Sequence, residues 1–287
     1  MTGFTRKRIE VSVKLSNDKF GSTGGDTVTL AGYRMTADLV HVGGESMGEL
    51  HLRVFGLSQS LMNQLTVIGA INRVNPQNSI LLAAGDDENG MTTVFNGTIS
   101  EAWADYNASP DVAFNVLAYV GYDALLKPVA AVSYQGSVAV EVVMADIAKT
   151  MGLAFVNHGV SVRLSNPYFS GTALTQARTC ARAAAIELDI DGDVLAIRPK
   201  DGPRAAAVQV FSPTTGLIGY PSLSSKGMTV RSIFNGEIRT GNDIRIEGSI
   251  VPSANGLFRV GPYSHSLSCE VPDGPWFTTM ECYSVSS

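Results

Sequence analysis

Hydrophobic and polar residues alternate in the first part of the chain. In residues 9–15 every second residue is Ile, Val or Leu, and the residues between them are Glu, Ser and Lys. A period of two also runs through residues 33–39 and 50–54. Because successive side chains of a β-strand point to opposite faces of the sheet, this pattern predicts three strands that each bury one face.

Three longer segments extend the predicted sheet. Residues 79–84, 91–106 and 114–125 are rich in apolar and β-branched residues, and a run of Gly, Asp, Glu and Asn between the first two favours a tight turn. Residues 57–64 predict one short helix. Short strands separated by turns are typical of a barrel or sandwich, so we expect residues 1–128 to form a first β-barrel domain.

The pattern changes to a helical period in residues 129–205. Apolar residues spaced three or four apart from 140 to 151 predict a helix with Ser137 as its N-cap, and a second helix is predicted after the N-cap Thr172. This part is predicted to be a small α+β domain. Its expected strands are residues 160–164, 186–190 and 194–197.

Alternation returns in residues 206–287, where we expect a second β-barrel domain. The predicted fold class is therefore mainly β with an α+β insertion: two small β-barrel domains that flank or embrace a small α+β domain. No repeat of about 20–50 residues is present, so a solenoid or propeller is not favoured.

Composition narrows the class of function. The chain has 287 residues, of which 45% are hydrophobic and 16% are charged, enough apolar content for a large core. Its 21 basic and 26 acidic residues give a net charge of -5 without a basic run, which disfavours tight binding of nucleic acid. No apolar stretch reaches the roughly 20 residues of a membrane helix, so no stable membrane association is expected.

The sequence offers no motif for catalysis, and we predict that the protein is not an enzyme. Its four histidines and three cysteines lack the spacing of a zinc or redox site, and no nucleophile elbow or phosphate-binding loop occurs. Residues 189–193 carry three aspartates, but they fit a hairpin turn better than a calcium loop. Trp103 and Trp276 could stack on a sugar, although both sit in apolar strand contexts that favour packing. Catalytic residues, metal ligands and cofactors are all expected to be absent.

Several short passages resemble the baseplate hub proteins of phage tails. The later passage is more specific than the others: Thr-Gly-Leu-Ile-Gly-Tyr-Pro at 215–221, then Gly-Met-Thr-Val at 227–230, then residues 238–244, which contain Thr-Gly-Asn-Asp. The matching passages span about residues 90–250. They are 95–102, 111–116, 137–153, 166–169, 215–221, 227–230 and 238–244.

This resemblance implies a structural role. In the hub family two β-barrels of one chain pack side by side and three chains close a ring of six barrels, so a threefold assembly can stack on a sixfold tube. The implied protein is a homotrimeric hub of the virion baseplate, assembled in the host cytoplasm, that connects the tail tube to the central spike and forms part of the DNA channel. The implied partners are the tail tube or distal tail protein, the central spike protein and the tape measure protein.

The resembling loops are the predicted interface residues, namely Gly216, Leu217, Ile218, Gly219, Tyr220, Pro221, Thr240, Gly241, Asn242 and Asp243. Two other classes of function stay open. A distal tail or tube-initiating protein with the same folds would form hexamers. A module that binds or degrades the cell wall would need a buried carboxylate pair for hydrolysis, and none is evident.

Overall fold

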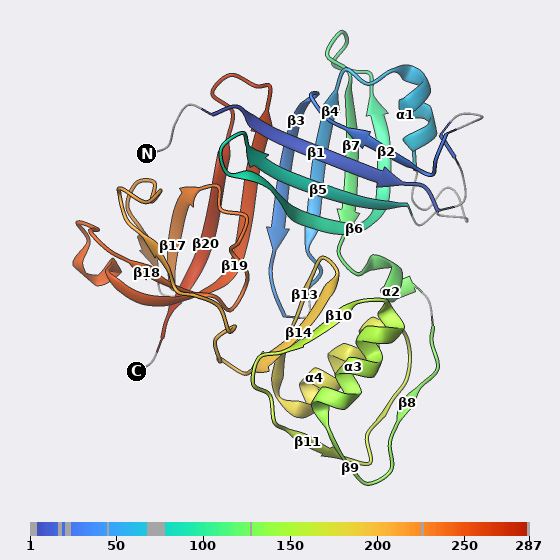
Figure 1. Ribbon diagram of the computed structural model, residues 1–287, viewed down its shortest axis with the longest axis vertical. Helices are drawn as coiled ribbons and strands as arrows, with labels where there is room; N and C mark the ends of the chain where they lie inside the picture. Colours follow the sequence, from blue (N-terminus) through green and yellow to red (C-terminus); the bar gives the residue numbers. More distant parts are fainter. Residues whose placement is uncertain are drawn as a thin grey trace.

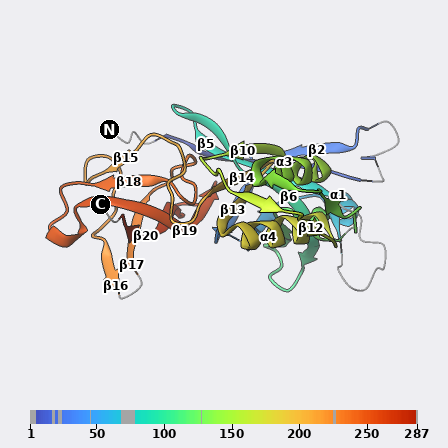
Figure 2. The ribbon, with the colours of Figure 1, turned by 90° about the horizontal axis from the view of Figure 1, so that it is seen from below.

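The computed structural model describes residues 5–16, 19–20, 24–44, 46–67, 78–126, 128–224 and 227–285. The fold is mainly β and has three parts (Figure 1). We name them the first β unit, the α+β unit and the second β unit. Figure 2 shows that they form a flat body from which the β16–β17 hairpin projects.

The first β unit contains the predicted strands and two helices. Its residues from Ile9 to Leu15 alternate between buried and partly exposed, as the sequence pattern predicts. Burying each such Val, Leu or Ile side chain stabilises the fold by about 1.5–3 kcal/mol. The elements are β1 (Lys7–Lys14), β2 (Thr27–Leu30), β3 (Arg34–His41), β4 (Glu49–Phe55), α1 (Gln59–Leu65), β5 (Ser79–Asp86), β6 (Gly90–Asp105), β7 (Ala113–Tyr119) and α2 (Tyr122–Leu126).

One expected strand of this unit is shorter than predicted. The strand expected at 114–125 ends at Tyr119, and α2 follows it. Gly121 lies between them with φ of 71°, a left-handed conformation that glycine adopts without steric cost and that interrupts the extended chain. β2 was not predicted from the sequence.

The α+β unit packs two helices against a small sheet. Thr172 caps the second helix as predicted, since its hydroxyl accepts a hydrogen bond from the Thr175 N–H (3.2 Å). The elements are β8 (Val132–Ser133), β9 (Ser137–Ala139), α3 (Val140–Met151), β10 (Ala154–Asn157), β11 (Arg163–Ser165), β12 (Tyr168–Phe169), α4 (Ala173–Ala184), β13 (Ile186–Asp191) and β14 (Val194–Pro199).

Two local predictions for the α+β unit were wrong. Ala139, not Ser137, occupies the N-cap position of α3, because Ser137 belongs to β9 and its hydroxyl accepts a hydrogen bond from Arg163 Nε (2.9 Å). The strand expected at 160–164 is displaced. β10 instead supplies the third strand of the sheet, where it pairs in parallel with β14.

The second β unit shares a continuous sheet with the first. β19 pairs antiparallel with β3 from Tyr263 opposite His41 to Cys269 opposite Met35. Among the described residues the pairing follows an open path, β16-β17-β20-β19-β3-β4-β7-β6-β5-β1-β2, with β15 and β18 branching from β19. The elements are β15 (Gln209–Phe211), β16 (Ser222–Ser224), β17 (Gly227–Ile233), β18 (Asp243–Ile246), η1 (Pro252–Ala254), β19 (Gly256–Cys269) and β20 (Trp276–Ser284).

Each part has its own hydrophobic core, but β19 contributes to two of them. Phe258 and Val260, near its start, belong to the core of the second β unit. Leu267 and Cys269, near its end, belong to the core of the first. Because one strand is anchored in both cores, the two β units are held side by side.

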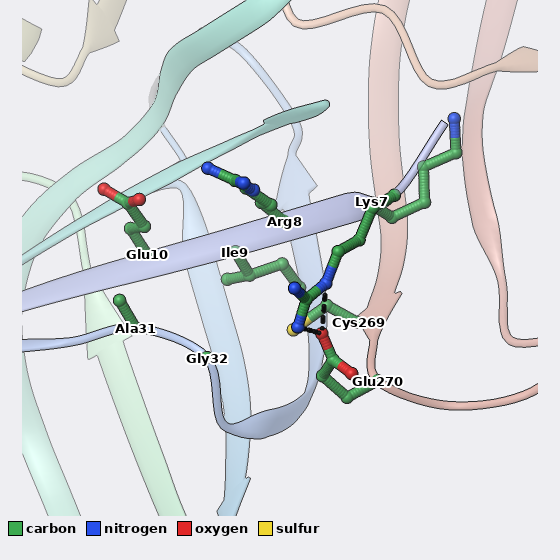
Figure 3. A pocket seen from close by; sticks show the side chains of 9 residues that line it. Lys7, Arg8, Ile9, Glu10, Ala31, Gly32, Cys269 and Glu270 are labelled. Carbon is green, nitrogen blue, oxygen red and sulfur yellow. Dashed lines mark hydrogen bonds and ion pairs between the residues drawn. The ribbon is translucent and has the colours of Figure 1, made fainter. Parts of the chain in front are cut away.

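The start of β1 lies beside the end of β19, so the sheet path returns from β1 to the neighbourhood of β19. A shallow pocket of about 140 Å³ marks this seam (Figure 3). Ile9 and Cys269 point toward one another across it, and Arg6 donates hydrogen bonds to Glu270 Oε1 from Nε (2.8 Å) and Nη2 (2.5 Å). The ion pair is exposed to solvent, so it adds little to the stability of the seam.

Candidate assembly surfaces

The loop Gly216–Pro221 leads into β16 and is half buried. Leu217 is buried and forms an isolated β-bridge with Ser232, and the Ile218 N–H donates to the Arg231 carbonyl (2.8 Å). Tyr220 instead has 58% of its surface exposed. The loop is therefore anchored on β17 by its first half and presents an aromatic side chain with its second half.

β16 continues this surface as an edge strand. Among the described strands it pairs only with β17, so its other edge is free to pair. Leu223 on β16 and Tyr283 on β20 are exposed apolar side chains of the same unit. The unpaired N–H and C=O groups of an edge strand are a template for pairing with another chain. The sequence patterns did not predict this edge.

The turn Thr240–Asp243 lies inside the molecule. Gly241 N donates to the Val260 carbonyl (2.8 Å), and Val260 N donates in return to the Asn242 carbonyl (2.8 Å). The Asn242 side chain accepts from the Arg239 N–H (2.6 Å). These bonds fold the turn onto β19. Thr240 and Asn242 are only 6% exposed, because residues of the same chain cover them.

All three parts of the molecule meet at this turn. The Gly241 carbonyl accepts from the Arg204 N–H (2.7 Å), which follows the α+β unit. A β-carbon on Gly241 would lie 2.8 Å from Arg198 Nε, and one on Gly43 of the first β unit would lie 2.7 Å from Thr240 Cγ2. Both glycines are needed because a side chain at either position would displace its neighbour. We call this meeting point the central junction.

Ion pairs surround the central junction. Arg198 Nε donates to Asp189 Oδ2 (3.1 Å), and both side chains are less than 10% exposed. Arg259 binds both carboxylate oxygens of Asp243 (2.8 and 3.1 Å). Arg204 pairs with Asp191. Burial raises the pKa of Asp189, although Arg198 and the Gly44 N–H (3.2 Å) oppose that shift. These ion pairs of the junction are therefore formed within one chain.

A larger groove, of about 890 Å³, separates the two β units. One wall is the β5–β6 turn, in which the Asp86 carboxylate accepts from Glu88 N (3.0 Å) and Asn89 N (2.8 Å). The other wall includes Gly216 and Leu217 of the predicted interface. Gly216 and Leu217 of the predicted interface loop therefore lie between the two β units and not on the outer surface.

The described residues contain no cluster of metal ligands and one accessible tryptophan ring. No group of three or more His, Cys, Asp or Glu side chains in them could hold a metal ion. Trp276 is 7% exposed and packs edge-to-face on Phe234 at 5.2 Å, so only Trp103, at 42%, has an accessible ring. Among the helices of the described part, none is long and apolar enough to cross a membrane.

The fold defines a mainly β protein in which one sheet runs through two β units. The chain belongs to the baseplate hub gp41 family, whose model matches residues 8–282. It is thus a structural component of a phage tail baseplate. No curated protein matches its sequence significantly.

Solved tail proteins share the fold at low sequence identity. The 43 kDa tail protein of prophage MuSo2 from Shewanella oneidensis is 9% identical with a TM-score of 0.61, covering 96% of this chain and 97% of that one. A tail protein from Neisseria meningitidis MC58 is 9% identical with a TM-score of 0.60, covering 96% of each. The E. coli c3393 protein, a type VI secretion component described as similar to T4 tail proteins gp27 and gp5, is 10% identical with a TM-score of 0.58, covering 96% and 77%.

Proposed function

We propose that this chain is the subunit of a homotrimeric hub that connects the sixfold tail tube to the threefold central spike and lines part of the DNA channel. The observation that carries the proposal is the β19–β3 pairing, which holds two β units side by side in one chain. Three copies then present six β units. Such a ring matches a sixfold tube on one side and keeps threefold symmetry for a spike on the other.

The proposed domains are 1–128 and 206–287, each a small β-barrel, and 129–205, the α+β domain. The three cores support this division, although Leu267, Cys269 and Trp276 of the third segment belong to the core of the first. The long strand β19 and the contacts of the central junction would keep the domains in a fixed relation. A fixed relation suits an adapter, since the spacing of its two barrels sets the match to the tube.

We place the contacts between subunits at the outer half of the loop Gly216–Pro221 and the adjoining edge of β16. Tyr220 and Leu223 are both more than half exposed there, and aromatic anchors of this kind dominate many interfaces. The buried turn Thr240–Asp243 would support that surface from within. The proposed partners are a second copy, the tail tube or distal tail protein, the central spike protein and the tape measure protein, in a virion assembled in the host cytoplasm.

Light scattering on the purified chain tests this proposal, because one subunit is 30.4 kDa. We expect three times this mass, either for the chain alone or after the spike protein is added. A hexamer would contradict the hub and indicate a distal tail or tube-initiating protein. A lasting monomer that degrades cell wall would contradict the structural role.

A further inference from the structure

Two histidines share one buried aromatic cluster at the central junction. His41 ends β3, and His265 lies in the neighbouring strand β19. Their ring centroids are 6.2 Å apart, Tyr263 stacks on His41 at 4.6 Å, and Phe234 meets His265 edge-on at 5.3 Å. His41 is 6% exposed and His265 is 1% exposed.

Burial lowers the pKa of both imidazoles, and for His41 it outweighs the opposing effect of Asp191 and the Val94 backbone. The Thr278 hydroxyl accepts the Asn235 N–H (3.0 Å), so its own proton is available for His265 Nδ1 (2.9 Å). That arrangement suits a neutral ring with its proton on Nε2. Within the described part of the chain, the buried Nε2 atoms of His41 and His265 make no hydrogen bond.

The charged groups near the pair are already engaged. Arg239 faces both rings, and its guanidinium donates to the carbonyls of Gly236 (2.8 Å) and Ile238 (2.7 Å). Asp191 of the β13–β14 hairpin faces His41 and is paired with Arg204. A proton on either ring would therefore meet the fixed Arg239 cation, and the carboxylate that faces His41 is already paired with Arg204.

The location makes such a proton mechanically important. His41 lines a cavity of about 220 Å³ between β6 and the tip of the β13–β14 hairpin, which Asp191, Asp193 and Arg239 also line. Water could hydrate a charged His41 if that hairpin or the 234–242 segment moved away. A local opening of the junction is thus the response to protonation that costs the least free energy.

We propose that His41 and His265 form a proton-sensitive joint, in which uptake of protons separates the second β unit and the α+β hairpin from β3 before the three cores unfold. This inference concerns the chain itself and does not depend on the proposed trimer. The central junction would then hold the three parts together and also respond to pH.

The direction of the pH response follows from burial. Burial lowers the pKa of His41 from 6.5 to about 4, against the opposing effect of Asp191 and the Val94 carbonyl, and it lowers the pKa of His265 well below its usual value. An opened junction restores ordinary pKa values and binds protons more readily. The ratio of open to closed molecules should therefore rise as the pH falls below about 6.5, about tenfold per pH unit for each imidazole that titrates only when open.

Trp276 provides a local readout, since it contacts Phe234 of the cluster and is one of two tryptophans. In a Trp103→Phe background, we would follow Trp276 emission and far-UV circular dichroism from about pH 7.5 to about pH 4.5, where free carboxylates stay mostly ionised. The emission should change at a higher pH than the circular dichroism. Coincident transitions would overturn the proposal.

His41→Phe is the diagnostic variant, because phenylalanine can keep the stack on Tyr263 without titrating. In this variant the ratio of open to closed molecules should lose the contribution of one imidazole, which is about tenfold per pH unit. His265→Leu should remove the same contribution. His51→Gln is the control, because the His51 side chain is 58% exposed and pairs with Glu49 (2.7 Å) outside the cluster. Unchanged behaviour of His41→Phe, or loss of the response in His51→Gln, would overturn the proposal.

Discussion

The loop Gly216–Pro221 and the turn Thr240–Asp243 belong to the same β unit, yet they face opposite surroundings. Tyr220 of the loop is 58% exposed, whereas Thr240 of the turn is 6% exposed and donates its hydroxyl to the Gly261 carbonyl (3.2 Å). The loop is tied to one neighbouring strand. The turn is tied to all three parts of the molecule, so changes in it should affect folding, and changes in the loop should affect association.

Glycine shows the same contrast in detail. Gly219 of the loop has φ of 66°, and a β-carbon on it would find nothing within 4 Å. Gly241 of the turn has φ of 86°, and its β-carbon would collide with Arg198. Both glycines permit a left-handed backbone, but only Gly241 also permits close approach between two parts of the chain.

The largest expected effect follows from removing the cation at the junction. Arg198→Met should lower the free energy of unfolding by about 3–5 kcal/mol, because it leaves the buried Asp189 carboxylate without a charged partner. Urea denaturation near neutral pH would measure the loss. The double variant Asp189→Leu/Arg198→Met should recover most of it. A small loss in the single variant would mean that the ion pair does not hold the junction.

The glycine pair gives the next effect in size. Gly241→Ala should destabilise the fold by about 3 kcal/mol, through a left-handed alanine and the displacement of Arg198. Gly219→Ala, with a similar φ and open space, should cost only about 1 kcal/mol. Thermal or urea unfolding of the two variants side by side measures the difference. Equal losses would show that backbone strain alone, and not close packing, explains Gly241.

Local patterns in the sequence predicted the elements whose burial depends on one sheet face or one helix stripe. Alternation identified β1, and the polar residue before an apolar stripe identified the Thr172 cap of α4. The pattern failed at β2, which has only four residues, and at α2, where the apolar residues after Gly121 predict a strand but form a helix. In short segments periodicity cannot separate strand from helix.

The candidate surfaces were harder to predict, because burial at the junction arises from distant segments. Gly43 packs against the Thr240 side chain, and Gly241 packs against the Arg198 side chain. No local pattern in the sequence predicts that these distant residues meet. The β19–β3 pairing that joins the two β units is equally nonlocal. The resemblance to hub proteins identified the correct family, but a turn rich in Gly, Asn and Asp is compatible with both an exposed loop and a buried corner.

The smallest effect on folding is expected at the exposed end of the comparison. Tyr220→Ser should change the free energy of unfolding by less than about 0.5 kcal/mol, because the side chain is largely in solvent. If the loop joins subunits, the same change should weaken trimer formation by at least about tenfold, since an aromatic anchor is lost. A concentration series by light scattering measures this, with Tyr168→Ser as the control, because Tyr168 is 66% exposed on the α+β unit. Equal association of the two variants would remove Tyr220 from the interface, and a large loss of stability would mean that the loop, like the turn, serves the fold of its own chain.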